Sequence, residues 1–365
     1  MPTLNHRSFA LNVLATGGLT LAGMRRASAQ RYDWLTRLLV GASGAPPVDL
    51  TFVPTVPGAE SIVPDVVKPV EADACYIELY LESIRLAKAR RFATHFHGVA
   101  YSFVTLAREG DARAQLAAIS KPEKLAELDR GAIDNVIVVS KQMMGPTAYR
   151  GGPVLLQFGL FSVKSGNLLS PVLDYVTRVS SAAGNSYVGA IKPFLPLITE
   201  GMDLIAGQRE DTALEVGVDT AIDLKTGCVS AIIDLPRGSI DVAKLSLDKD
   251  RKLLLNGKPI DAGYAVFSFR PSTEKSDYGE IPELRERYAA MQAAIRSGKQ
   301  KDAQDALAAF RLTAIASPDL IPADSSKLVE KATQKVRKAF PPGGVGDVTG
   351  ARPAPESLSD IRLYD

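Results

Sequence analysis

Two of the three histidines in the chain, His95 and His97, lie two residues apart in the stretch RFATHFHGVAYSF at 91–103. Residues spaced by two share one face of a β-strand, so two imidazoles here could bind one metal ion. Such a site needs a third ligand, and the remaining histidine, His6, lies in a segment with the features of a leader. The basic run RLAKARR before the pair also opposes a bound cation. The pattern favours a structural role, with a metal-dependent or hydrolase-like enzyme centred on His95 and His97 as the alternative hypothesis.

The two cysteines, Cys75 and Cys228, both fall in strand-like runs. Isolated cysteines in such runs are typical of small buried apolar residues. A disulfide between them needs an oxidising compartment and a short distance in the fold, so their pairing stays open. A nucleophilic role for Cys228 is disfavoured, because TGCVSAII is typical of the start of a hairpin strand.

Other motifs that carry chemistry are missing from the sequence or stand in the wrong context. The sequence has no Gly-x-Ser-x-Gly turn and no Asp-x-Asp-x-Asp-Gly calcium loop. Lys258 lacks the glycine spacing of a phosphate-binding loop and is followed by proline. Ser272 and Lys275 have a serine–lysine spacing, but we expect them in a polar loop. The sequence predicts no catalytic residue, no bound metal and no cofactor.

The charge balance and the N-terminus bear on partners and location. The 43 Lys and Arg residues nearly cancel the 41 Asp and Glu residues, which gives no electrostatic reason to expect nucleic acid. Residues 1–29 combine a weakly basic start, an apolar run and the small-residue site Ala27-Ser28-Ala29, in the order of a secretory signal peptide. Arg25 and Arg26 would also suit the flank of a membrane anchor. We expect a periplasmic or membrane-anchored protein, with a cytoplasmic protein as the alternative.

The elements that must position these residues are mainly β-strands. Residues 30–70 are rich in proline, which predicts an extended linker or a strap across the domain surface. From residue 71 to residue 270, alternating patterns such as Ile77, Leu79 and Leu81 indicate about nine short strands. A Lys-Thr-Gly turn at 225–227 predicts a hairpin, and the polar run DKDR at 248–251 predicts another turn. The predicted class is α+β, with an antiparallel β-sandwich as the main domain.

An apolar segment at 167–207 interrupts this domain with helical spacing and predicts an inserted helical hairpin. The commoner role for such an insert is to cover one end of the β domain. The functional alternative is a contact with a protein partner, a second copy or a membrane surface. The apolar face of its second helix would make that contact: Tyr187, Ile191, Phe194, Ile198, Met202 and Ile205.

After residue 270 the pattern predicts a helical unit at 281–340 and a disordered Pro/Gly-rich tail at 341–365. Asp324 or Ser325 is expected to cap the third helix of the unit. Lys327, Lys331 and Lys335 are spaced by four and form a basic face on that helix. A solvated face is the simpler interpretation, and contact with lipid headgroups or an acidic partner is the alternative.

Taken together, these patterns favour a non-enzymatic binding or assembly protein that uses the apolar hairpin to contact a protein partner or a second copy. Contact with a membrane surface is the weaker form of this hypothesis. Besides the enzyme centred on the two histidines, a β-sandwich that carries a small hydrophobic ligand between sheet and hairpin is a further alternative.

Overall fold

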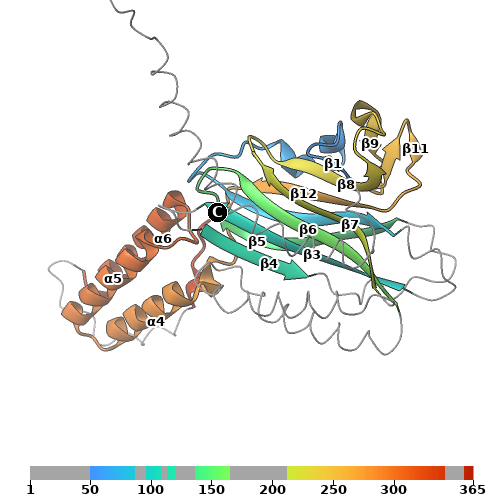
Figure 1. The fold of residues 1–365 in the computed structure, drawn as a ribbon. Helices are drawn as coiled ribbons and strands as arrows, with labels where there is room; N and C mark the ends of the chain where they lie inside the picture. The colour runs from blue at the N-terminus through green and yellow to red at the C-terminus, as the bar shows by residue number, and fades with distance from the viewer. Residues whose placement is uncertain are drawn as a thin grey trace, which may run out of the picture.

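The computed structural model describes residues 50–86, 96–107, 113–119, 136–164, 212–341 and 357–364. Within these ranges the chain forms a β-rich body and a unit of three helices beside it (Figure 1). The predicted α+β class with antiparallel sheets is therefore confirmed. The segments 1–29 and 167–207, as well as His95, lie outside the described residues.

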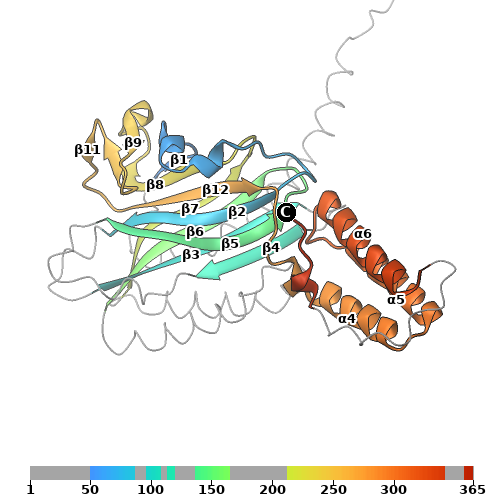
Figure 2. The same ribbon diagram turned by 180° about the vertical axis from the view of Figure 1, so that it is seen from behind.

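Two antiparallel sheets make up the body. The strand order of the five-stranded sheet is β1 (Leu50–Val53), β8 (Cys228–Pro236), β12 (Tyr264–Ser272), β2 (Tyr76–Arg85) and β5 (Ile137–Ala148). The order of the four-stranded sheet is β4 (Arg113–Ile119), β3 (Phe96–Ala107), β6 (Val154–Lys164) and β7 (Thr212–Ile222). Both views show the two sheets as stacked layers (Figure 2).

The main core lies between the two sheets. Phe158 of β6 stacks on Phe267 of β12, with ring centroids 5.5 Å apart. The alternation that predicted an apolar face on β2 is confirmed, since both sheets bury apolar side chains in one cluster. Its members include Ile77, Leu79, Leu81, Ile232 and Phe267 from the five-stranded sheet and Ala100, Val104, Leu156, Phe158 and Val216 from the four-stranded sheet.

A second apolar cluster covers the opposite face of the five-stranded sheet. It joins β8 and β12 to a small sheet of β9 (Leu245–Leu247), β10 (Leu253–Leu255) and β11 (Lys258–Pro259). β9 and β10 form a hairpin, so the predicted turn at 248–251 is confirmed. Residues 50–70 add β1 and the 3-10 turns η1 (Ala59–Ser61) and η2 (Pro64–Val67), with several buried valines. This part of the chain is a strap packed onto the sheet, which is the second of the two alternatives that the proline-rich composition left open.

The predicted hairpin at 225–227 is also wrong. β7 pairs with β6 in the four-stranded sheet, whereas β8 lies between β1 and β12 in the five-stranded sheet. The chain therefore crosses from one sheet to the other at this turn. The crossing is tight, because a Cβ on Gly227 would stand 2.7 Å from the carbonyl oxygen of Phe269 and from the Cα of Val66.

The helical unit consists of α4 (Pro282–Arg296), α5 (Gln300–Ile315) and α6 (Pro322–Ala339), as predicted. Its core includes Leu284, Tyr288, Met291, Phe310, Leu328 and Ala332. Neither Asp324 nor Ser325 caps α6, which begins at Pro322 and places both residues in its first turns. Among the described residues no helix combines the length and the apolar character needed to cross a bilayer.

The prediction of a disordered tail over 341–365 fails for residues 357–364. This stretch contains the 3-10 turn η8 (Leu358–Asp360), and after the turn Ile361 and Leu363 pack on the helical unit. Leu358, Ile361 and Leu363 are all buried in the core of that unit. The burial of these three apolar side chains therefore orders a stretch for which the composition of the tail predicts disorder.

Candidate functional site

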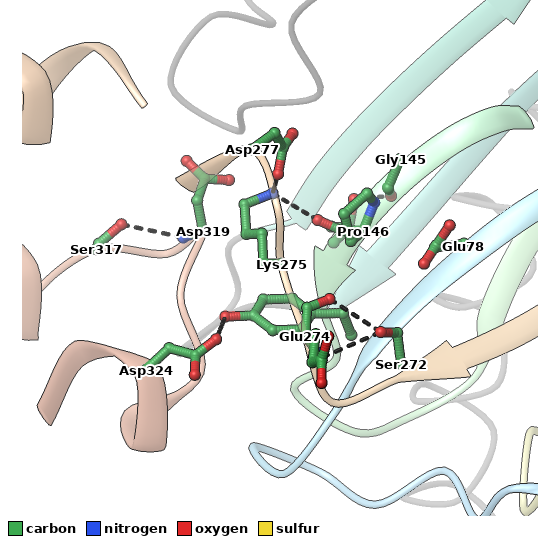
Figure 3. Close-up of polar contacts among 12 residues, drawn as sticks. Glu78, Gly145, Pro146, Ser272, Glu274, Lys275, Asp277, Ser317, Asp319 and Asp324 are labelled. Carbon is green, nitrogen blue, oxygen red and sulfur yellow. Dashed lines mark hydrogen bonds and ion pairs between the residues drawn. The ribbon is translucent and has the colours of Figure 1, made fainter. Parts of the chain in front are cut away.

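Buried and half-buried polar side chains from four separate segments meet where the sandwich joins the helical unit (Figure 3). We call this group the junction cluster and define it as Tyr76, Lys275, Asp277, Asp324 and Tyr364. Tyr76 begins β2, and the two residues at 275 and 277 follow β12. Asp324 lies in the first turn of α6, and Tyr364 follows η8. The cluster thus ties the sheet, its exit segment, a helix and the chain end together.

Asp324 is the centre of the cluster and is only 1% exposed. The Tyr76 hydroxyl donates to its Oδ2 over 2.7 Å, and the Tyr364 hydroxyl donates to the same oxygen. Its Oδ1 lies 3.7 Å from the Lys327 Nζ, and Lys327 is largely exposed. Hydrogen bonds from neutral donors therefore carry most of the stabilisation of this buried carboxylate.

Both phenols are themselves positioned by backbone groups. The Ile321 N–H donates to the Tyr76 hydroxyl over 3.2 Å, and the Lys275 N–H donates to the Tyr364 hydroxyl over 2.8 Å. Burial, and then the hydrogen bond to Asp324, raise the pKa of Tyr76 and of Tyr364 above the ordinary tyrosine value. Both hydroxyls stay protonated at neutral pH, so each can serve as a donor.

Lys275 is the buried cation of the junction cluster and is 1% exposed. Its Nζ donates to the carbonyl oxygen of Pro146 over 2.7 Å and lies 2.9 Å from Asp277 Oδ1. The ammonium also lies 5.8 Å from the centre of the Tyr76 ring. The Ser272 hydroxyl donates to the Glu274 carbonyl, and the contacts of the Lys275 ammonium are with Pro146 and Asp277 (Figure 3). Lys275 thus lies in the polar loop after β12, as expected, but its side chain is buried there.

Arg150 adds a second link between the sandwich and the helical unit. Its guanidinium donates to the Leu320 carbonyl over 2.7 Å, in the turn between α5 and α6. The same group pairs with Asp73 at 2.6 Å. Tyr76 and Ala148 of the sandwich also pack against Ile321. The junction thus combines apolar packing with hydrogen bonds that run in defined directions.

A second buried carboxylate, Glu82, lies within the sandwich and is fully buried. The β2–β12 register places Ser83 opposite Val266 and Leu81 opposite Phe267, so Glu82 is the extra residue of a β-bulge. Its Oε1 accepts from Arg270 over 2.6 Å and from the Ser268 hydroxyl. Its Oε2 lies 3.0 Å from the Arg251 guanidinium. Two arginines therefore surround this carboxylate.

Of the residues singled out in the sequence, those that the structure describes lie in separate parts of the fold. His97 lies in β3 opposite Val163, and the unbroken register from Phe96 to Thr105 shows that Gly98 introduces no bulge. Cys75 and Cys228 are free buried thiols, and burial raises the pKa of both. Among the described residues, no group of three or more His, Cys, Asp or Glu side chains could hold a metal ion.

The basic face of α6 is partly occupied by aromatic rings. Lys327 Nζ lies 4.8 Å from the centre of the Tyr364 ring, and Lys335 Nζ lies 6.0 Å from that of Tyr288. Burial lowers the pKa of Lys335. Lys331 is half-buried. Lys327 and Lys335 therefore each lie near an aromatic ring of the same chain. The six apolar residues predicted as the contact face of the hairpin lie outside the described residues.

Sequence reasoning missed the junction cluster, because its members are separated by up to 288 positions. One signal was available at Asp324, a carboxylate in the first turn after Ile-Pro. That position predicts a helix cap, whereas the structure makes Asp324 a buried hydrogen-bond acceptor. No family model, curated protein or solved structure matches the chain.

Proposed function

We propose that this chain is a non-enzymatic binding or assembly protein in which the β-sandwich holds the helical unit in one fixed orientation. The observation that carries the proposal is the convergence of Tyr76 and Tyr364, from two distant segments, on one oxygen of Asp324. A fixed orientation serves a protein that presents surfaces to a partner, because association then requires little reorganisation.

The chemistry of the junction cluster supports a positioning role. The polar atoms of Tyr76, Lys275 and Tyr364 all bond to groups of the same chain. The hydrogen bonds of such a network form in only one arrangement, so the network specifies geometry more than it adds stability. Raised tyrosine pKa values keep the donors in the required state across the neutral range.

The contact surface in this proposal is the apolar face of the insert at 167–207, with a second copy of the chain as the partner. The sequence supports it, because only Lys192, Glu200 and Asp203 are charged between Val179 and Gly207. A long apolar segment with so few charges is typical of a surface that is covered in the assembled state.

The test is the concentration dependence of the mass of the full chain, measured by light scattering after size exclusion. We expect self-association in the unaltered chain and its loss in Ile198→Asp. Leu312→Asp is the matched control, since Leu312 is 70% exposed on α5 and its replacement should leave association unchanged. A chain that stays monomeric at all concentrations contradicts the proposal, and so does equal association of the unaltered chain and the folded Ile198→Asp variant.

A further inference from the structure

The last described residues, 357–364, contact the rest of the molecule mainly through side chains spaced along a short peptide. Leu358, Ile361 and Leu363 are buried in the helical core. The chain end lies at the junction of sandwich and helices in both views (Figure 1, Figure 2). We call residues 357–364 the C-terminal segment.

The C-terminal segment holds its own backbone in shape. Ser357 and Asp360 form a capping box, in which the Ser357 N–H donates to Asp360 Oδ2 over 2.6 Å. The N–H groups of Asp360 and Ile361 donate to the carbonyls of Ser357 and Leu358. Because these hydrogen bonds are local, the segment can dock as a unit with three apolar anchors.

Its end makes the polar contacts that fix the docked position. The Tyr364 hydroxyl donates to the buried Asp324 carboxylate and accepts from the Lys275 N–H. A hydrogen bond to a buried carboxylate discriminates strongly between tyrosine and phenylalanine, because losing it leaves a charge under-solvated.

The surface that receives the segment is shaped for its backbone. A Cβ on Gly279 would stand 2.7 Å from both the Cα and the N of Ser359. These are backbone atoms, so a rotamer change cannot relieve the clash. Only glycine at position 279 allows the segment to approach this closely.

We infer that η7 (Tyr278–Glu280), the start of α4, Lys275 and Asp324 form a peptide-docking site and that the C-terminal segment is its occupant. The site recognises a short peptide with the pattern Leu-x-x-Ile-x-Leu-Tyr, in which apolar anchors enter the helical core and the phenol binds a buried carboxylate. Occupation completes the junction cluster, so the segment acts as a clasp between sandwich and helices. This inference does not depend on the proposed self-association.

The test uses a chain that ends at Glu356 and a fluorescent peptide of residues 357–365 added in trans. Fluorescence anisotropy should show that the peptide binds the shortened chain, and binds the full chain at least about tenfold more weakly because the site there is already filled. A peptide carrying Tyr364→Phe should bind the shortened chain about tenfold more weakly or worse, since it lacks the hydrogen bond to Asp324. Equal binding to both chains, or none to a folded shortened chain, would overturn the inference.

If the shortened chain does not fold, hydrogen exchange in the full chain decides. Gly279→Ala should abolish the protection of the amides of Ile361 and Leu363 while leaving that of β12 unchanged. Lys301→Ala, an exposed change on α5 outside the proposed site, is the control and should leave both unchanged. Equal protection of the segment in Gly279→Ala and in the unaltered chain would show that no specific docking site exists.

Discussion

The two buried carboxylates of this protein are held by opposite means. Glu82, in the bulge of β2, lies between the guanidinium groups of Arg270 and Arg251. Asp324, at the junction, accepts hydrogen bonds from two neutral phenols, and its nearest cation is 3.7 Å away on a largely exposed lysine. One carboxylate is balanced by charge within a single unit, and the other by hydrogen bonds that connect separate parts of the chain.

The comparison shows what each device achieves. Ion pairs around Glu82 fasten the β9–β10 turn to the sheet, because Arg251 belongs to that turn and its carbonyl also accepts from the Ser83 hydroxyl. Their strength depends on having opposite charges close together, while the direction of approach matters less. Phenol donors act only along defined directions. Asp324 therefore fixes orientation, whereas Glu82 chiefly compensates charge.

The largest effect is expected from Glu82→Gln. The amide leaves two arginines, 17% and 25% exposed, without a carboxylate partner. Breaking such a pair costs about 3 kcal/mol of unfolding free energy, measured by urea denaturation. The control is Glu78→Gln on the same strand, where a half-buried carboxylate accepts from Tyr80 and Gln142 and the loss should stay below about 1 kcal/mol. Similar losses for both variants would mean that the arginines are satisfied without Glu82.

A smaller effect is expected from Tyr76→Phe at the junction. The change removes one donor from the Asp324 carboxylate and leaves the ring in place, so it should cost about 2 kcal/mol without creating a cavity. Tyr80→Phe is the matched control, because its hydroxyl donates to the half-buried Glu78 over 2.9 Å and its loss should cost about 0.5 kcal/mol. The readout that separates a positioning role from a purely stabilising one is hydrogen exchange in α6. Tyr76→Phe should raise exchange in the first turn of α6, and unchanged exchange there would count against orientation by Asp324.

Local patterns in the sequence predicted most of the fold, and the misses share a physical cause. The nine expected strands omit β1, β4 and β11. β1 follows a proline pair and was judged by composition, yet a proline-rich segment can still supply an edge strand. β4, with the sequence RAQLAAI, is rich in residues that favour helices, and its pairing with β3 overrides that preference. In both cases the segment forms a strand because it pairs with a neighbouring strand, and its own local preference does not predict that.

The sites were harder to predict than the strands, for the same reason. His95 and His97 are conspicuous because they lie two residues apart in the sequence, whereas the junction cluster joins residues 76, 275, 324 and 364. Alternation separates Glu82 from the apolar face of its strand, and the side chains that surround it, Arg251 and Arg270, come from segments distant in the sequence. A bulge and a helix docked by distant hydrogen bonds leave no periodic trace in the sequence.

The third effect is confined to alkaline pH and compares a tyrosine of the sandwich with the tyrosines of the junction cluster. Burial raises the pKa of Tyr264 from 10.0 to about 12 in the folded chain. The unfolded chain therefore releases this proton first, so the stabilising contribution is complete below pH 10.0 and declines as pH rises from there to about 12. Within that window Tyr264 should lower the unfolding free energy by about 1.4 kcal/mol per pH unit, and Tyr264→Phe should flatten the profile by that amount.

The pKa of Tyr76 is raised further than that of Tyr264, so the stabilising contribution of Tyr76 should decline only at a higher pH. Denaturation of the unaltered chain, Tyr264→Phe and Tyr76→Phe across the alkaline range measures both slopes. Identical slopes in all three would show that neither phenol is protected from ionisation, and the neutral-donor account of Asp324 would then fail, since a phenolate beside a buried carboxylate repels it.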